Sequence, residues 1–184
     1  MMRTILWVLA GIFAGVLIHL VVILSLPALA SHDVWSRVTE LGANNKAVVL
    51  PAVVAGAPNP LRLDPELTYA VCQMNLSTGP GVVSGTLPDA FWSLAVFNRS
   101  GAVIYSTTNR DGIGQTLDLG IFNVAQTRLL AQQKLDIAEG LLIVESTDDD
   151  VFVVVRLAPP YPAVRRRYEK MLGAIQCGNI NSGG

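Results

Sequence analysis

A long uncharged apolar segment near the N-terminus is the feature that most constrains this chain. Ile5 to Leu26 contains no Asp, Glu, Lys or Arg. As an α-helix rising about 1.5 Å per residue, this segment would be about 33 Å long, which matches a hydrocarbon core of about 30 Å. No later stretch approaches that length. The sequence therefore predicts one transmembrane anchor within residues 1–30 and a globular domain over residues 31–184, and it excludes a multi-span membrane protein.

The charges around the apolar segment predict its orientation. Arg3 and the N-terminal amine precede the segment, and positive charge stays on the cytoplasmic side. We therefore expect a cytoplasmic N-terminus and an exported domain. One alternative stays open, because Ala28-Leu29-Ala30 has the small-x-small pattern of a signal-peptide cleavage site. Cleavage after Ala30 would release the domain, although the apolar run exceeds the length typical of signal peptides.

Two glycines within the apolar segment indicate a way for the helix to self-associate. Gly11 and Gly15 form a GxxxG pattern, which allows two spanning helices to approach closely. Glycine is also common in spanning helices that do not pair. The lipid bilayer is the predicted partner of this segment, and a second copy of the helix is an additional one.

The exported part of the chain has the pattern of a β-rich domain. Its charges are balanced, with 13 Lys and Arg against 14 Asp and Glu in the whole chain, so a nucleic-acid partner is not expected. Short turns favour antiparallel pairing. We predict an α+β fold, an antiparallel β-sandwich or barrel-like domain with peripheral helices and a polar tail from residue 178. The predicted strands cover residues 67–76, 82–86, 91–97, 102–107, 115–122, 141–145 and 151–157, and the predicted helices cover residues 33–41, 123–133 and 163–176.

The domain contains two cysteines, which we expect to be paired. Cys72 lies in the first long strand and Cys177 follows the last helix. A pair of cysteines in an exported domain favours a disulfide, with two free thiols as the alternative. Such a bond would tie the last helix to the sheet.

The sequence carries no recognisable catalytic constellation. The two histidines are His19, inside the apolar segment, and His32, beside it. A Ser-His-Asp or Cys-His site is excluded unless His32 folds back onto the domain, and so is a histidine-rich zinc site. The run Asp148-Asp149-Asp150 lacks the spacing of a calcium loop and is interpreted as an exposed turn. We predict a protein that is not an enzyme and that holds no metal or cofactor.

Four residues are candidates for a ligand or partner surface: Asp89, Trp92, Tyr105 and Arg156. Trp92 suits such a surface if it is exposed, although core packing is its more common use. Arg156 ends an apolar strand and requires a charged partner, for which Asp89, Asp118 and Glu145 are candidates. An alternative function, a small-ligand binder or a carboxylate-dependent enzyme, would use Asp89, Tyr105, Asp118 and Arg156.

Several motifs in order resemble a bacterial family. They are Leu67-Thr68-Tyr69-Ala70-Val71-Cys72, Asn75-Leu76-Ser77-Thr78-Gly79-Pro80, Pro88-Asp89-Ala90-Phe91-Trp92-Ser93-Leu94-Ala95, Phe97-Asn98-Arg99-Ser100-Gly101 and Phe152-Val153-Val154-Val155-Arg156. Over residues 33–178 the chain resembles the family called domain of unknown function 1254, in its short, membrane-anchored alphaproteobacterial form. The resemblance implies a β-sandwich-like fold and an envelope location, and it implies no established reaction.

The resemblance also implies where the domain works and with what. It places the anchor in the bacterial inner membrane and residues 31–184 in the periplasm. Longer members of the family carry a second domain, of unknown function 1214, so a separate protein of that type is an expected partner. We expect a non-catalytic interaction or assembly module.

Overall fold

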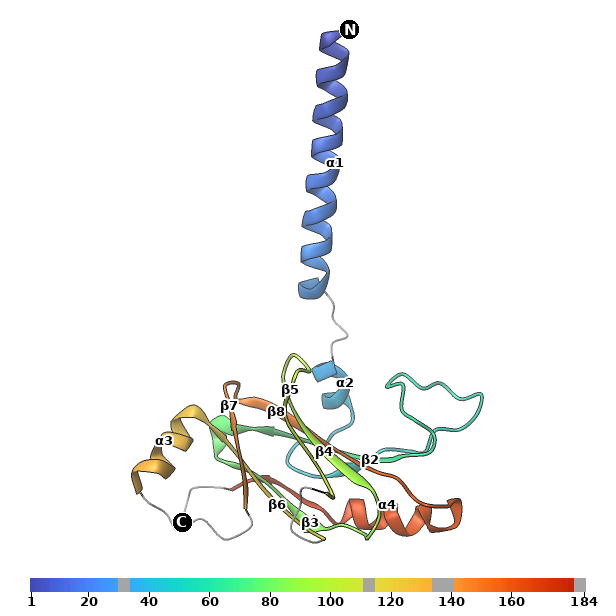
Figure 1. Cartoon of the computed structure of the whole chain (residues 1–184), viewed down its shortest axis with the longest axis vertical. Helices are drawn as coiled ribbons and strands as arrows, with labels where there is room; N and C mark the ends of the chain where they lie inside the picture. Colours follow the sequence, from blue (N-terminus) through green and yellow to red (C-terminus); the bar gives the residue numbers. More distant parts are fainter. Residues whose placement is uncertain (30–33, 111–114, 134–140, 181–184) are drawn as a thin grey trace.

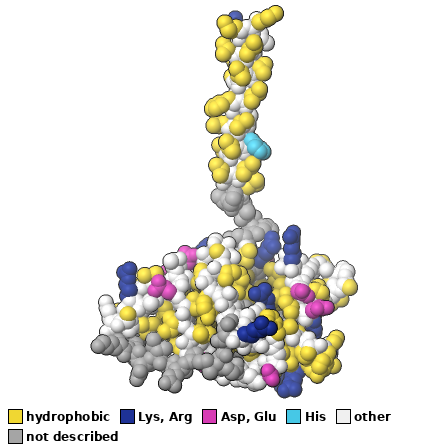
Figure 2. Space-filling model, in the orientation of Figure 1, with side chains coloured by type: hydrophobic (Ala, Val, Ile, Leu, Met, Phe, Trp, Pro, Cys, Tyr) yellow, Lys and Arg dark blue, Asp and Glu magenta, His cyan; other side chains and the backbone are white. Residues whose placement is uncertain are grey.

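The computed structural model describes residues 1–29, 34–110, 115–133 and 141–180 (Figure 1). Its first element is α1 (Met2–Leu29), a single continuous helix. The part from Met2 to Leu26 has a mean hydropathy of 2.6 and is long and apolar enough to cross a membrane. Hydrophobic side chains cover the visible face of this helix along its length (Figure 2). Gly11 and Gly15 lie on α1 with open space where a Cβ would be, and self-association through them stays a prediction.

The rest of the described chain forms two mostly antiparallel sheets with peripheral helices, which confirms the predicted fold class. The first sheet has the order β1 (Val48–Val49), β2 (Thr68–Asn75), β8 (Asp150–Leu157), β4 (Trp92–Asn98) and β5 (Val103–Thr108). The second sheet has the order β7 (Leu142–Ser146), β6 (Thr116–Asn123), β3 (Gly81–Thr86) and β9 (Gln176–Asn179). All seven predicted strands are present, and β1 and β9 are additional short edge strands.

Strand alternation on β8 explains how the two sheets pack. Val151, Val153 and Val155 face the second sheet and belong to the main core. Phe152 and Val154 face the opposite side, where they contact a separate apolar cluster. The continuous apolar run of this strand is therefore buried on both faces, as expected for the central strand of a covered sheet.

The outer face of the first sheet is covered by α2 (Val34–Glu40) and by part of the long loop that follows β1. Val38 of α2 is buried against Phe152 and Val71. Phe152 also stacks on Phe97, with 4.9 Å between ring centroids and 5° between ring planes. This second, smaller cluster attaches the segment that follows the anchor to the sandwich.

The second sheet contains one parallel pair, β6 with β7, and α3 (Val124–Gln133) makes the crossover. Asn123 caps this helix: its side-chain oxygen accepts the Gln126 backbone N–H at 2.9 Å, and the Gln126 side chain accepts the Asn123 N–H at 2.9 Å. This reciprocal pair is a capping box, which satisfies two backbone donors at once.

The C-terminal end differs from the sequence prediction. The last helix, α4 (Arg165–Gly173), follows a 3-10 turn (Pro162–Val164) and ends before Gln176, where the prediction extended it. Gln176–Asn179 then pairs with β3, although a polar tail was predicted from Gly178. The prediction was wrong here because short polar strands gain their stability from pairing with a neighbour rather than from an apolar pattern.

The predicted disulfide joins Cys72 to Cys177. Cys72 belongs to β2 in the first sheet and Cys177 to β9 in the second, so the bond crosses the sandwich. The two cysteines are separated by 105 positions in the sequence. The bond therefore holds the C-terminal edge strand, rather than the last helix as predicted, against the opposite sheet.

Candidate functional site

The four predicted surface residues do not come together. Trp92 is 2% exposed and lies in the main core, so it serves the packing role and cannot form part of a ligand surface. Tyr105 is half-buried against the same core from β5. Arg156 is exposed on the outer face of the first sheet, and Asp89 is exposed in the turn before β4. The backbone of the first sheet thus separates Arg156 from Trp92 and Tyr105.

Arg156 forms no ion pair with any residue that the structure describes. Two of its predicted partners, Asp118 on β6 and Glu145 on β7, belong to the second sheet. Because Arg156 alternates with the inward-facing Val155 and Leu157, its guanidinium points away from that sheet. The Arg156 side chain is exposed, so its charge does not require a carboxylate partner. The third predicted partner, Asp89, is exposed in the turn before β4 and forms no ion pair with Arg156. His32, the histidine that could have folded back onto the domain, lies outside the described residues.

A polar cleft at one end of the sandwich is the strongest candidate site. It has a volume of about 650 Å³ and is open to solvent. Its walls come from the end of β2, the β4–β5 hairpin and the β7–β8 turn, and its lining residues are Asn75, Ser77, Arg99, Ser100, Asp148, Asp149 and Asp150.

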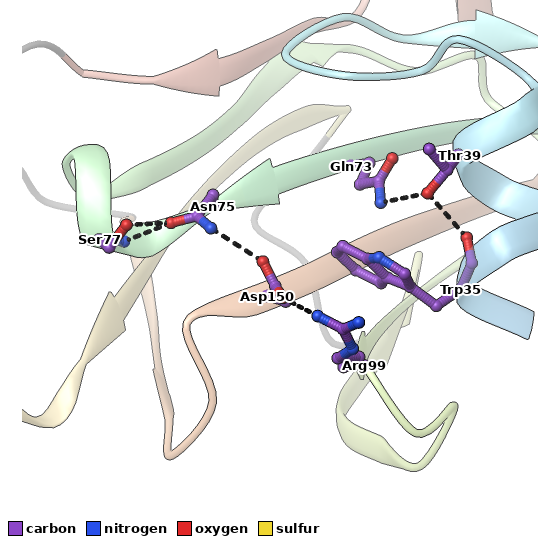
Figure 3. Close-up of polar contacts among 7 residues, drawn as sticks. All are labelled: Trp35, Thr39, Gln73, Asn75, Ser77, Arg99 and Asp150. Carbon is purple, nitrogen blue, oxygen red and sulfur yellow. Dashed lines mark hydrogen bonds and ion pairs between the residues drawn. The ribbon is translucent and has the colours of Figure 1, made fainter. Parts of the chain in front are cut away.

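Asp150 lies at the centre of the hydrogen bonds in the cleft (Figure 3). One of its carboxylate oxygens accepts the Asn75 amide at 2.9 Å, and the other pairs with the Arg99 guanidinium at 2.8 Å. The Asn75 side-chain oxygen in turn accepts the Ser77 backbone N–H at 2.9 Å. This arrangement joins three segments that are distant in sequence, so the acidic run is more than the solvated turn that its composition indicated.

Two further contacts connect the cleft to α2. The Arg99 guanidinium lies over the Trp35 ring, 5.7 Å from its centroid. On the same face of β2, the Gln73 side chain donates to the Thr39 hydroxyl at 3.0 Å (Figure 3). Because α2 begins directly after the anchor segment, these contacts fix the first element of the domain to the sheet beside the cleft.

The turns around the cleft are held by their own side chains. The Asn98 side-chain oxygen accepts the Ala102 backbone N–H at 2.9 Å, and the Ser146 hydroxyl donates to the Asp148 carbonyl at 2.7 Å. Asn and Ser compete effectively for backbone groups in turns, so these residues preset the positions of Arg99 and Asp150. The cleft can therefore receive a polar group by hydrogen bonding to preplaced carboxylates and one guanidinium.

Sequence reasoning missed this cleft. Arg99 lies in a turn between two predicted strands and Asp150 in an acidic run, and nothing in their local patterns indicates that they pair. The relation becomes visible only in the register of β8 between β2 and β4, which places Asp150 opposite Asn75 and its neighbour Val151 opposite Asn98. Among the described residues, no group of three or more His, Cys, Asp or Glu side chains has the arrangement of a metal site.

The free edge of the first sheet is a second surface of interest. Among the described residues, β5 pairs only with β4. Its six residues, Val103–Thr108, include no charged side chain and no proline. Val103 is 56% exposed and Ser106 is exposed as well. Natural sheets usually protect such an edge with charges, prolines or bulges. β5 has one irregularity, at Ile104 between its pairs with Val96 and Phe97, and its remaining residues are regularly paired with β4 and can accept another strand.

Comparison with known proteins supports the fold and nothing finer. No family model matches the chain, and no curated protein matches its sequence. The crystal structure of the VPA0106 protein from Vibrio parahaemolyticus is similar with a TM-score of 0.53 and 8% identity, over 64% of this chain and 29% of that one. An uncharacterized protein from Burkholderia cenocepacia has a TM-score of 0.48 and 11% identity, over 82% and 41%. The chain thus spans less than half of either structure.

Proposed function

We propose that this chain is a single-pass protein of the bacterial inner membrane, with its N-terminus in the cytoplasm and residues 31–184 in the periplasm. The length and composition of α1 support the anchor, and Arg3 at its leading end supports the orientation. The disulfide supports an oxidising compartment. Mass spectrometry of the mature N-terminus tests the anchor, because a protein that begins at Ser31 would have lost it.

The periplasmic domain is, in this proposal, a non-catalytic interaction or assembly module of the type called domain of unknown function 1254. The open edge of β5 is the observation that carries this function. An incoming polypeptide can pair with the edge of β5 between Val103 and Thr107, and exposed Val103 can contribute apolar contact. Strand addition of this kind gives affinity through main-chain hydrogen bonds and specificity through alternate side chains.

Site-specific photo-crosslinking in native membranes tests this interaction. A benzophenone amino acid at Val103 is expected to crosslink a partner polypeptide, whereas the same probe at exposed Thr86 on β3 is not. The substitution Ser106→Lys adds a charge to the open edge and should reduce the Val103 crosslink at least fivefold. Thr116→Lys, at an exposed position on β6, is the matched control and should leave it unchanged.

The identity of the crosslinked partner distinguishes two expectations. A separate protein with a domain of unknown function 1214 is the expected heterologous partner. A product between two copies of this chain would instead support self-association, for which Gly11 and Gly15 are the predicted contact in the membrane. Equal crosslinking at Val103 and Thr86 would contradict a specific role for β5.

The polar cleft supports a second candidate function, binding of a small polar ligand. Arg99 and Asp150 present opposite charges within one cleft of about 650 Å³. A thermal-shift screen with free amino acids and short peptides tests this function on the full chain in detergent. A stabilising compound should lose its effect in Arg99→Ala and keep it in Arg128→Ala, which changes an exposed cation on α3.

A further inference from the structure

The loop over residues 51–61 is unusually apolar for an exposed segment. It contains no charged residue, and its only polar side chain is that of Asn59. Val54 is 63% exposed, and Ala52, Ala55 and Pro58 are exposed as well. A contiguous apolar surface of this kind marks a contact with another protein or with a membrane.

This loop lies beside α2 on the outer face of the first sheet (Figure 1). The Arg37 guanidinium of α2 donates to the Pro60 carbonyl at 3.2 Å. Leu61 and Leu63 pack into the same small cluster as Val38. The base of the loop is thus attached to the helix that follows the anchor, while its apolar tip remains uncovered by any described residue.

The short connection to the anchor keeps this face of the domain near the bilayer. The helix α1 ends at Leu29 and α2 begins at Val34. Because a chain extends at most about 3.6 Å per residue, the Cα atoms of these two residues lie within about 18 Å of each other in any conformation of the connection. The outer face of the first sheet, which α2 covers, is therefore the face nearest to the membrane end of α1.

Two cations flank the loop. Arg37 and Arg62 line a shallow groove between α2 and the loop, together with Glu40, the one carboxylate of that groove. Both arginines are exposed, and Figure 2 shows Lys and Arg side chains projecting from the domain on the side toward α1. Exposed cations beside apolar side chains are typical of a surface that binds at the lipid headgroup level.

Hydrogen bonds of Asn59 hold the turn that carries Arg62. The Asn59 side chain accepts the Leu63 backbone N–H at 2.9 Å and donates to the Leu63 carbonyl at 2.8 Å. Arg62 adopts a φ of +51°, a conformation that L-residues seldom populate. Such a conformation persists where the surrounding bonds enforce it, so this turn holds the Arg62 side chain at a set position beside the apolar tip.

We propose that the 51–61 loop is a second membrane contact, docking on the periplasmic surface of the bilayer that α1 spans. Val54 and its small apolar neighbours enter the headgroup region, and Arg37 and Arg62 meet the phosphates of anionic lipids. This inference rests on the anchoring by α1 proposed above. The docked loop and α1 together would fix the orientation of the domain on the membrane.

Depth-dependent fluorescence quenching tests the docking. The full-length chain with Val54→Cys is labelled with an NBD fluorophore and reconstituted in vesicles of phosphatidylethanolamine and phosphatidylglycerol at a 3:1 ratio. Cys72 and Cys177 do not compete for the label because they are disulfide-bonded. Lipids that carry a spin label near the headgroup are expected to quench the fluorophore at position 54 at least twofold more than the same fluorophore in Thr86→Cys, on β3 of the second sheet.

The charge requirement is tested in the same vesicles. In the Val54→Cys background, Arg62→Glu should reduce the quenching at least twofold, whereas Arg128→Glu, on α3, should not. Flotation of the vesicles separates the two proposals. A chain that floats while positions 54 and 86 are quenched equally overturns the docking and leaves the anchor intact, and a chain that does not float overturns both. A blue-shifted emission at position 54 without lipid quenching would indicate contact with a second copy and would also overturn the docking.

Discussion

Reduction of the Cys72–Cys177 disulfide should destabilise the domain strongly, and it should release β9 first. The bond closes a loop of 105 residues. In the chain-entropy treatment, a loop of this length restricts the unfolded state enough to contribute about 4.7 kcal/mol to the free energy of unfolding. Globular domains have a total of about 5–15 kcal/mol, so the reduced protein should be marginally stable.

The structure also predicts where the effect appears. β9 is four residues long and, among the described residues, pairs as a strand only with β3. Its links to the first sheet are the Cys72–Cys177 bond and a hydrogen bond that the Asn179 side chain donates to the Asn75 carbonyl of β2. Without the bond, its backbone hydrogen bonds should open in a local equilibrium well before the central strands unfold. Amide hydrogen exchange of Cys177, Gly178 and Asn179 should therefore accelerate in the reduced protein, while exchange in β8 follows global unfolding.

The assay is urea unfolding of the full chain in detergent micelles, followed by tryptophan fluorescence with and without reductant. With a slope of about 2 kcal/mol per molar urea, the expected loss moves the midpoint down by about 2 M. The double variant Cys72→Ala/Cys177→Ala controls for the reductant, because its midpoint should not respond to it. A midpoint shift below about 0.5 M, or unchanged exchange in β9, would refute this reasoning.

Three further predictions concern packing, capping and charge. Trp92→Ala should lower the free energy of unfolding by about 3–5 kcal/mol in the same urea assay because its side chain is buried, whereas Phe91→Ala, at a residue 52% exposed, should cost much less. Asn123→Ala removes the cap of α3 and should cost about 1–2 kcal/mol, with faster amide exchange in the first turn of that helix; unchanged exchange there would argue against the cap. A double-mutant cycle of Arg99→Ala and Asp150→Ala should give a coupling of about 0.2–1 kcal/mol because the pair is partly exposed, and a coupling near zero at low salt would contradict a role in holding the cleft.

Much of the local structure could be predicted from the sequence. The apolar run of Ile5 to Leu26 predicts a spanning or signal helix, because its uncharged side chains are more stable in the hydrocarbon core of a membrane than in water. The seven main strands and the cap at Asn123 follow from alternation and from turn chemistry, which act over a few residues. The expected export of the domain and its two cysteines were enough to indicate the bond between Cys72 and Cys177.

Only the tertiary structure decided how these elements combine. The order of the strands, the parallel pairing of β6 with β7 and the edge strand β9 depend on contacts between distant segments, which leave no periodic trace in the local sequence. For the same reason, the local sequence around each residue does not predict that Arg99 pairs with Asp150 or that it contacts Trp35. The apolar pattern of the sequence shows which side chains gain stability from burial. The fold decides which of them are buried, because it places Trp92 in the core and leaves Val54 exposed.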